Sequence, residues 1–177
     1  LKSYITAIEE CHARVEALDG LLDEMLRGWK RQELCLNIMA LRGIDQLSAM
    51  TIVSEIGDLK RFKTAPEFMS FLGLVPGEFS SGERTHRGSI TKSGNRQVRR
   101  ILVEDAWSYR LLPAMSPAWK KRTRTVSAEI RKISWKAQKR LNHKYKRLRA
   151  RGLMATKAIT AVARELAGFV WSVAQAT

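Results

Sequence analysis

The chain has 177 residues, 45% of them apolar, and a formal net charge of +15. It can bury a core, but its most apolar stretch, 161–176, is short and holds Arg164 and Glu165, which excludes a membrane span there. The two cysteines, Cys11 and Cys35, have helix-core spacing and no CxxC pairing. This pattern excludes a CxxC metal site and favours a reduced, cytoplasmic setting.

The charge is unevenly distributed along the chain. Residues 1–60 hold seven Lys and Arg against ten Asp and Glu, a net charge of −3, whereas residues 61–177 hold 25 against seven, a net charge of +18. A basic part of that size favours nucleic acid as a partner. The alternatives are an anionic membrane surface and a basic face that is simply solvated.

Residues 1–33 carry a heptad pattern. Apolar side chains recur at alternating spacings of three and four along a seam made of Leu1, Tyr4, Ile8, Cys11, Val15, Leu18, Leu22, Met25 and Trp29. The seam is narrow and its flanks are charged, so it predicts a coiled-coil helix and a homo-oligomer. The alternative is one long amphipathic helix packed on its own domain. Because the chain begins at Leu1 inside this pattern, we expect it to be part of a longer protein.

Residues 34–177 are predicted to form the second domain, which opens with a helical hairpin. A helix ending near Leu41, a tight turn at 42–45 and a second helix over 46–56 resemble a helix-hairpin-helix element. The backbone N–H groups of such a turn can hold a phosphate. Asp45, however, stands where that hairpin usually has its second glycine, and its carboxylate would repel a phosphate. A purely structural hairpin is the alternative.

The middle of the chain predicts a short helix, a small β-hairpin and a longer helix. Thr64 to Glu67 is a capping-box pattern that begins a helix ending by Gly73. Residues 79–81 and 89–91 predict two short strands that flank a serine-containing loop. Asn95 is the expected N-cap of a helix over 96–111.

The C-terminal part predicts two more helices. Residues 120–151 carry 14 Lys and Arg against one acid, Glu129, with a stripe at Ile133, Ala137, Leu141, Lys144 and Leu148. The broad basic face suits a phosphate backbone, and its candidate binding residues are Lys136, Lys139, Arg140 and Lys144. Trp135 fits either a core position or a platform for stacking on bases. The helix over 155–174 is largely apolar and is predicted to close the core.

The serine loop combines a candidate nucleophile with cations. A serine hydroxyl needs a base or a positive charge to attack a phosphodiester, and the developing negative charge needs cations or N–H groups around it. The loop and the helix after it supply Arg84, Arg87, Lys92, Arg96 and Arg99 as candidate nucleic-acid contacts. The loop lacks a clear general base. From the residues alone, a phosphate-binding loop is the default and catalysis the alternative.

Several stretches carry a family resemblance. LRGIDQLSAMTIVSEIGDLKRF (41–62) and FMSFLGLVPGEFSSGERTHRGSITKSGNRQVRRIL (68–102) closely resemble the C-terminal transposase domain of a family of bacterial insertion-sequence recombinases. The relatives of that family include Piv-type DNA invertases and bridge-RNA-guided recombinases. The segments 132–152 and 158–171 resemble the end of the same domain, and the heptad segment resembles the coiled coil that joins its two halves.

This resemblance implies a mechanism. Full-length members have an N-terminal RuvC-like domain whose four acidic residues bind Mg²⁺, and a C-terminal serine that directly precedes a glycine. In PGEFSSG (76–82) that serine is Ser81, which by family likeness attacks DNA and forms a phosphoserine linkage. A structured bridge RNA pairs with donor and target DNA. No metal or cofactor is expected on this chain itself, because the acidic half of the site belongs to the other domain.

We therefore expect a mainly α fold with a long N-terminal coiled-coil helix, a helix-hairpin-helix-like element, a small β-hairpin carrying the serine loop, and C-terminal helices. The expected function is that of a catalytic-serine domain of a bacterial, cytoplasmic DNA transposase, inactive when separated from its RuvC-like domain. The alternative is a non-catalytic DNA- or RNA-binding module.

Overall fold

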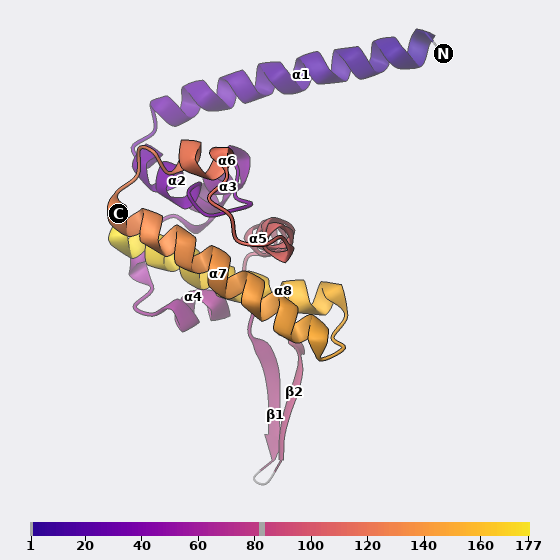
Figure 1. The fold of residues 1–177 in the computed structure, drawn as a ribbon, viewed down its shortest axis with the longest axis vertical. Coiled ribbons are helices and arrows are strands. Elements are labelled where there is room, and N and C mark those ends of the chain that lie inside the picture. Colours follow the sequence, from indigo (N-terminus) through magenta and orange to yellow (C-terminus); the bar gives the residue numbers. More distant parts are fainter. Residues whose placement is uncertain (1, 82–83) are drawn as a thin grey trace. The chain divides into compact units, whose positions relative to one another are not determined.

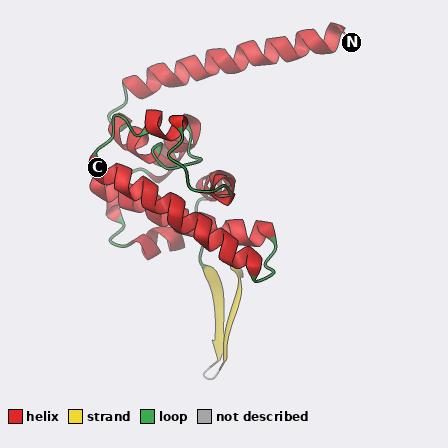
Figure 2. Cartoon of the chain, in the orientation of Figure 1, coloured by secondary structure: helices red, strands yellow, loops and turns green. Residues whose placement is uncertain are grey.

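The computed structural model describes residues 2–81 and 84–177, but not the side chains of 79–81 and 84–87. The chain forms two compact units, Leu1–Glu33 and Leu34–Thr177. It is 72% helical, and the described residues form eight α-helices and one two-stranded antiparallel sheet (Figure 2). The prediction of a mainly α fold is therefore confirmed.

The first unit consists of helix α1, Lys2–Arg27, and the short segment that follows it. Five residues of its predicted apolar seam expose more than half of their surface, namely Tyr4, Ile8, Val15, Leu18 and Met25. Such exposure is unusual for an apolar stripe, which normally faces a core or a second helix. The predicted helix is confirmed, and its pairing into a coiled coil stays a prediction.

The boundary between the units falls within α2 (Gln32–Ile38), which with α3 (Gln46–Ile56) forms the predicted helical hairpin. The Asp45 carboxylate accepts a hydrogen bond of 2.8 Å from the Ser48 amide, and Gly57 ends α3 with a φ of 75°. The first helix ends at Ile38 rather than near Leu41, because the next residues form short turns. These findings confirm the Asp45 cap, whereas phosphate binding by the turn stays a prediction.

The short helices η1 (Leu59–Arg61) and α4 (Ala65–Phe71) come next. Thr64 caps α4 as predicted and accepts a hydrogen bond of 3.4 Å from the Glu67 amide. The Glu67 carboxylate accepts from the Lys63 amide at 2.8 Å. In a capping box this bond would come from Thr64, so the reciprocal contact lies one residue earlier than the pattern predicts.

The predicted β-hairpin is confirmed, but its strands are longer than predicted. Strand β1 spans Pro76–Ser81 and β2 spans Arg84–Ile90, so only residues 82–83 separate them. The strands are antiparallel, with Ser81 opposite Arg84 and Pro76 opposite Ile90, and a bulge lies between Pro76 and Glu78. In Figure 1 the hairpin extends away from α5 and α8.

The remaining helices build the core around α8. They are α5 (Arg96–Ala106), η2 (Trp107–Arg110), α6 (Pro117–Arg122), α7 (Ala128–Ala150) and α8 (Ala155–Ala176). Helices α4, α5 and α7 all pack against α8, and α7 lies alongside it in Figure 1. The α8 face that they cover is fully apolar at Ile159, Val162, Leu166, Val170 and Val173. The prediction that this helix closes the core is confirmed.

Candidate nucleic-acid interface

The predicted nucleophile lies at the far end of the hairpin. Ser81 is the last residue of β1, and its backbone pairs with Arg84, the first residue of β2. The side chains of Ser81, Arg84 and Arg87 lie outside the described part of the structure, as do Gly82 and Glu83. The roles predicted for these three side chains therefore stay predictions.

The base of the hairpin is held tightly by backbone contacts. The amides of Thr91 and Lys92 donate to the carbonyls of Val75 at 2.9 Å and Gly73 at 3.1 Å. Gly73 and Gly94 both have positive φ, and a Cβ on Gly94 would overlap the carbonyl oxygen of Phe71. Only glycine combines this backbone conformation with so close an approach.

Asn95 and Arg99 connect the hairpin base to α5. The Asn95 side chain accepts from the Val98 amide at 2.9 Å, which confirms the predicted N-cap. Its amide nitrogen donates to Glu55 on α3 at 2.7 Å. The half-buried Arg99 guanidinium donates to the carbonyls of Leu72 at 2.9 Å and Ser93 at 3.0 Å. Arg99 thus has a structural role in addition to any contact with nucleic acid.

A groove runs from the hairpin base across α5 and α8, and we call it the hairpin-base groove. One hollow of about 580 Å³ lies between the hairpin base and α8, and a second of about 360 Å³ lies between the hairpin base and α5. The two hollows share Ile90, Lys92 and Thr160. Their lining includes one carboxylate, Glu104, and six cations: Lys92, Arg96, Arg99, Arg100, Lys157 and Arg164.

The groove brings together three of the predicted contacts, Lys92, Arg96 and Arg99, and adds residues that sequence reasoning missed. Lys157 and Arg164 lie on α8, which the sequence analysis assigned to the core. Their spacing of seven, with Thr160 and Ala161 between them, places all four on one helix face. The seven-residue spacing of these two cations could have predicted a basic stripe on this helix. Most residues of the segment are apolar, however, and this favoured its assignment to the core.

The basic face of α7 is a separate surface. Lys136 and Arg140 line a smaller hollow of about 180 Å³ with α4 and α8, and neither lines the hairpin-base groove. Lys139 is exposed, and its ammonium lies 5.8 Å from the centre of the Trp135 ring. Trp135 is half-buried against Trp119, with ring centres 6.1 Å apart. This packing favours the core alternative for Trp135.

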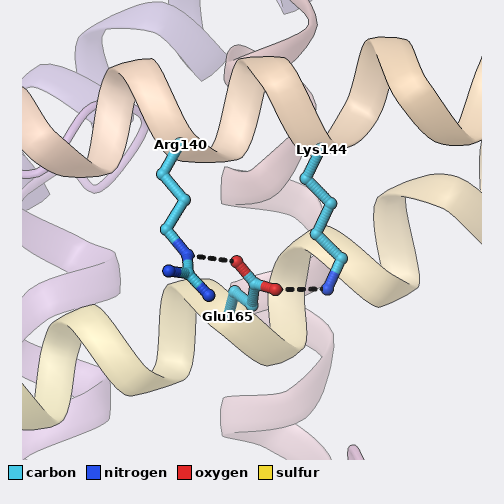
Figure 3. Close-up of polar contacts among 3 residues, drawn as sticks. All are labelled: Arg140, Lys144 and Glu165. Atoms are coloured by element: carbon cyan, nitrogen blue, oxygen red, sulfur yellow. Dashed lines mark hydrogen bonds and ion pairs between the residues drawn. The ribbon is translucent and has the colours of Figure 1, made fainter.

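Lys144 is buried rather than on the basic face. It is 8% exposed, and its ammonium lies 2.6 Å from Glu165 on α8, while Arg140 contacts the other oxygen of that carboxylate at 2.9 Å (Figure 3). Lys144 belongs to the apolar stripe of α7, and at that position its side chain points toward α8 rather than into solvent. A phosphate contact by Lys144 would have to break this ion pair, so Lys136 and Lys139 are the better candidates on α7.

The electrostatics of this triad reflect burial and pairing together. Burial lowers the pKa of Lys144, and the hydrogen bond and charge of Glu165 only partly offset that effect. Burial alone would raise the pKa of Glu165, but the hydrogen bonds from Arg140 and Lys144 outweigh it and lower that pKa. Glu165 is therefore ionised at neutral pH and joins α7 to α8.

The described residues contain no group of three His, Cys, Asp or Glu side chains placed to hold a metal ion. Within the same residues, no helix has both the length and the apolar character needed to cross a membrane.

A mainly helical domain with a projecting hairpin and a cationic groove at its base is a fold suited to a protein that handles nucleic acid. Residues 35–124, just over half of the chain, match the family described as "Transposase IS116/IS110/IS902 family". The chain belongs to this transposase family.

Curated relatives agree with this assignment. The chain is 45% identical over 160 residues to "Putative transposase y4qE" of Sinorhizobium fredii, which is 90% of this chain and 41% of the relative. It is 30% identical over 99 residues to "Probable family 20 transposase" of Pseudomonas aeruginosa, 56% of this chain and 28% of the relative. It is also 30% identical over 93 residues to "Transposase for insertion sequence element IS1111A" of Coxiella burnetii, which is 52% of this chain and 26% of the relative. The chain therefore spans less than half the length of these relatives.

Proposed function

We propose that this chain is the catalytic-serine domain of a DNA transposase, with Ser81 as the nucleophile. The observation that carries the proposal is the position of Ser81 at the end of β1, opposite Arg84, on a hairpin whose base is fixed in a cationic groove. Membership of the transposase family supports DNA as the substrate.

In the proposed step, the Ser81 oxygen forms a bond to a DNA phosphorus atom and loses its proton to a base outside the described residues. The bond from phosphorus to one deoxyribose oxygen breaks, and that oxygen leaves as a hydroxyl after taking up a proton. The product is a phosphoserine linkage, which conserves the energy of the broken bond for strand exchange. Arg84 and Arg87 would neutralise the charge that develops on the phosphate oxygens.

The hairpin-base groove would hold the nucleic-acid backbone during this step. Six lining cations against one carboxylate give it the charge to bind several consecutive phosphates. Most of the charged side chains among the groove's described residues are cations, which suit phosphate groups of any sequence. This is compatible with a bridge RNA that supplies the sequence specificity by base pairing, as the family resemblance implies.

The resemblance also assigns Mg²⁺ to acidic residues of a RuvC-like domain. The described residues of this chain provide no such cluster. We infer that the chain alone binds DNA and RNA but does not cleave DNA.

The decisive experiment uses the full-length protein with its guide RNA, Mg²⁺ and target DNA labelled at either end. Denatured products of the wild type, Ser81→Ala and Ser80→Ala are separated on a gel. We expect a covalent protein–DNA adduct that only Ser81→Ala loses, with DNA affinity unchanged, because one neutral hydroxyl adds little beside many cations.

Two other outcomes would each overturn part of the proposal. Loss of the adduct only in Ser80→Ala would make the neighbouring serine the nucleophile. Absence of any adduct on a pre-nicked substrate, despite tight binding, would leave the non-catalytic DNA- or RNA-binding module as the function.

A further inference from the structure

Another cavity, of about 480 Å³, lies between α3 with the turn that precedes it and the helices α5 and η2. It differs from the rest of this basic unit because oxygen atoms dominate its polar lining. Three carboxylates and three hydroxyls line it: Asp45, Glu104, Asp105, Ser48, Thr51 and Ser108.

Each of the three hydroxyl groups donates its proton in a hydrogen bond within the protein. Ser48 Oγ donates to Asp105 Oδ1 at 3.2 Å, and Ser108 Oγ donates to the Asp105 carbonyl at 2.8 Å. Thr51 Oγ1 donates to the Leu47 carbonyl at 2.7 Å. A hydroxyl has a single proton, so each of these oxygens can only accept a hydrogen bond from a group in the cavity.

Asp105 contributes a buried carboxylate to the lining of the cavity. It is 8% exposed, and its Oδ2 atom is fully buried without a hydrogen-bond partner among the described residues. A buried polar atom is normally satisfied, so this oxygen calls for a donor. The neighbouring carboxylates of Asp45 and Glu104 are exposed at the cavity mouth and would attract a positively charged one.

The lining has few donors to balance these acceptors. Among the described residues, Arg100 is the one cation that lines the cavity, and its Nε atom is 2.9 Å from Glu104 in an ion pair. The Gln97 amide is the other side-chain donor. A guanidinium group is the natural complement, because it carries five N–H donors and no acceptor.

We propose that this cavity is a receptor for the guanidinium group of an arginine side chain that a protein partner supplies. A guanine base also presents N–H donors, but it brings acceptors and a phosphate, and the carboxylates at the mouth would repel that phosphate. Charge complementarity thus favours the side chain of a protein over a nucleotide.

Binding of the cation should depend on pH. The pKa of Asp105 is raised to about 7: burial is the largest cause, the Ser48 hydrogen bond opposes it, and the charges of Asp45 and Glu104 add to the increase. Arg100 on α5 also lines the cavity. Tyr109 in η2 is buried and interacts with the charge of Asp105, and burial raises the pKa of Tyr109, so that it is neutral. The ionised fraction of Asp105 then rises about tenfold from pH 6 to pH 8, and affinity for a cation rises with it.

Amide chemical shifts of the ¹⁵N-labelled chain report on this site during a titration with methylguanidinium at constant ionic strength. We expect saturable shifts at Gly43, Ser48 and Ser108 and an apparent affinity about tenfold higher at pH 8 than at pH 6. Methylammonium should bind more weakly, because it has fewer donors.

Variants test whether the carboxylates are responsible. Asp105→Asn should abolish the saturable amide shifts with methylguanidinium. Glu104→Gln should weaken methylguanidinium binding several-fold, and its exposed position means that the fold stays intact. Glu129→Gln removes the same charge outside the cavity and should bind like the wild type. The proposal fails if no saturable shift occurs, if Glu104→Gln and Glu129→Gln behave alike, or if guanosine binds more tightly at the same amides.

Discussion

The Asp105 carboxyl makes stability depend on pH. Its pKa in the folded chain is about 7, against an ordinary value of 3.8. Between these two values the folded state binds more protons than the unfolded state, so the free energy of unfolding falls as pH rises and levels off above pH 7. We expect urea midpoints to decrease from pH 5 to pH 8 in the wild type and to change much less in Asp105→Asn. Parallel curves for the two proteins would contradict this account.

Gly94 tests how the hairpin base is held. Gly94→Ala combines a φ of 79° with an overlap on the Phe71 carbonyl. Gly152 is a matched control, because its φ is 80° but a Cβ there meets no atom within 4 Å. We expect Gly152→Ala to cost about 1–2 kcal/mol from backbone strain alone and Gly94→Ala to cost clearly more in urea unfolding. Equal losses would show that the close approach to Phe71 does not matter.

At the scale of the elements, helix boundaries followed from local chemistry. Asp45, Thr64 and Asn95 were predicted caps, and each accepts the expected backbone hydrogen bond. A cap depends on a few neighbouring residues, so sequence alone is enough to find it. The strand lengths were wrong by several residues, because a hairpin with polar residues on both faces has no alternating pattern to mark its ends.

The candidate groove was predictable only in part. Lys92, Arg96 and Arg99 follow one another along the chain, and their proximity could be inferred. Lys157 and Arg164 join them only through the packing of α8 against α5, which no local pattern encodes. Lys144 is the opposite case: its charge predicted an exposed contact, but its position within an apolar stripe buries it. Its acidic partner, Glu165, is 21 residues away in the sequence, so the ion pair was not evident from local sequence.

The triad of Arg140, Lys144 and Glu165 predicts an asymmetry between two substitutions. Glu165→Gln leaves the buried Lys144 ammonium without its counter-charge and should cost about 3 kcal/mol. Lys144→Met removes the buried charge and keeps most of the packing, while Glu165 retains Arg140, so it should cost less than about 1.5 kcal/mol. Urea unfolding of the two variants measures both values. A greater loss in Lys144→Met would contradict this prediction.

For the whole molecule, the hairpin-base groove predicts how DNA affinity responds to salt. Replacing Lys157 and Arg164 together by alanine should lower the slope of log affinity against log salt by about 1.8 on duplex DNA, because two phosphate contacts and the counterion release that accompanies them are lost. Lys60 and Lys63 are exposed and lie outside the groove, so their double alanine variant is the matched control. Fluorescence anisotropy with a labelled duplex over a range of salt concentrations gives both slopes, and equal slopes would exclude the groove.

Helix α1 predicts self-association. Its exposed apolar residues repeat at coiled-coil spacing, so pairing with a second copy would bury them. We expect sedimentation velocity to show a concentration-dependent dimer or larger oligomer that the double variant Ile8→Asp, Val15→Asp dissociates. Glu9→Asp changes a residue off the seam and should leave the assembly intact. A wild-type monomer at all concentrations would contradict the predicted pairing.

The hairpin is held at its base by backbone hydrogen bonds, so a change there would act on its far end as on a lever. Its six-residue strand β1 is about 20 Å long, so a tilt of about five degrees at Gly73 and Gly94 displaces the far end by nearly 2 Å. A misplacement of about 1 Å can slow an enzymatic reaction about a hundredfold. If Ser81 is the nucleophile, as we propose, substitutions at Gly73 or Gly94 would therefore reduce turnover without changing the serine itself.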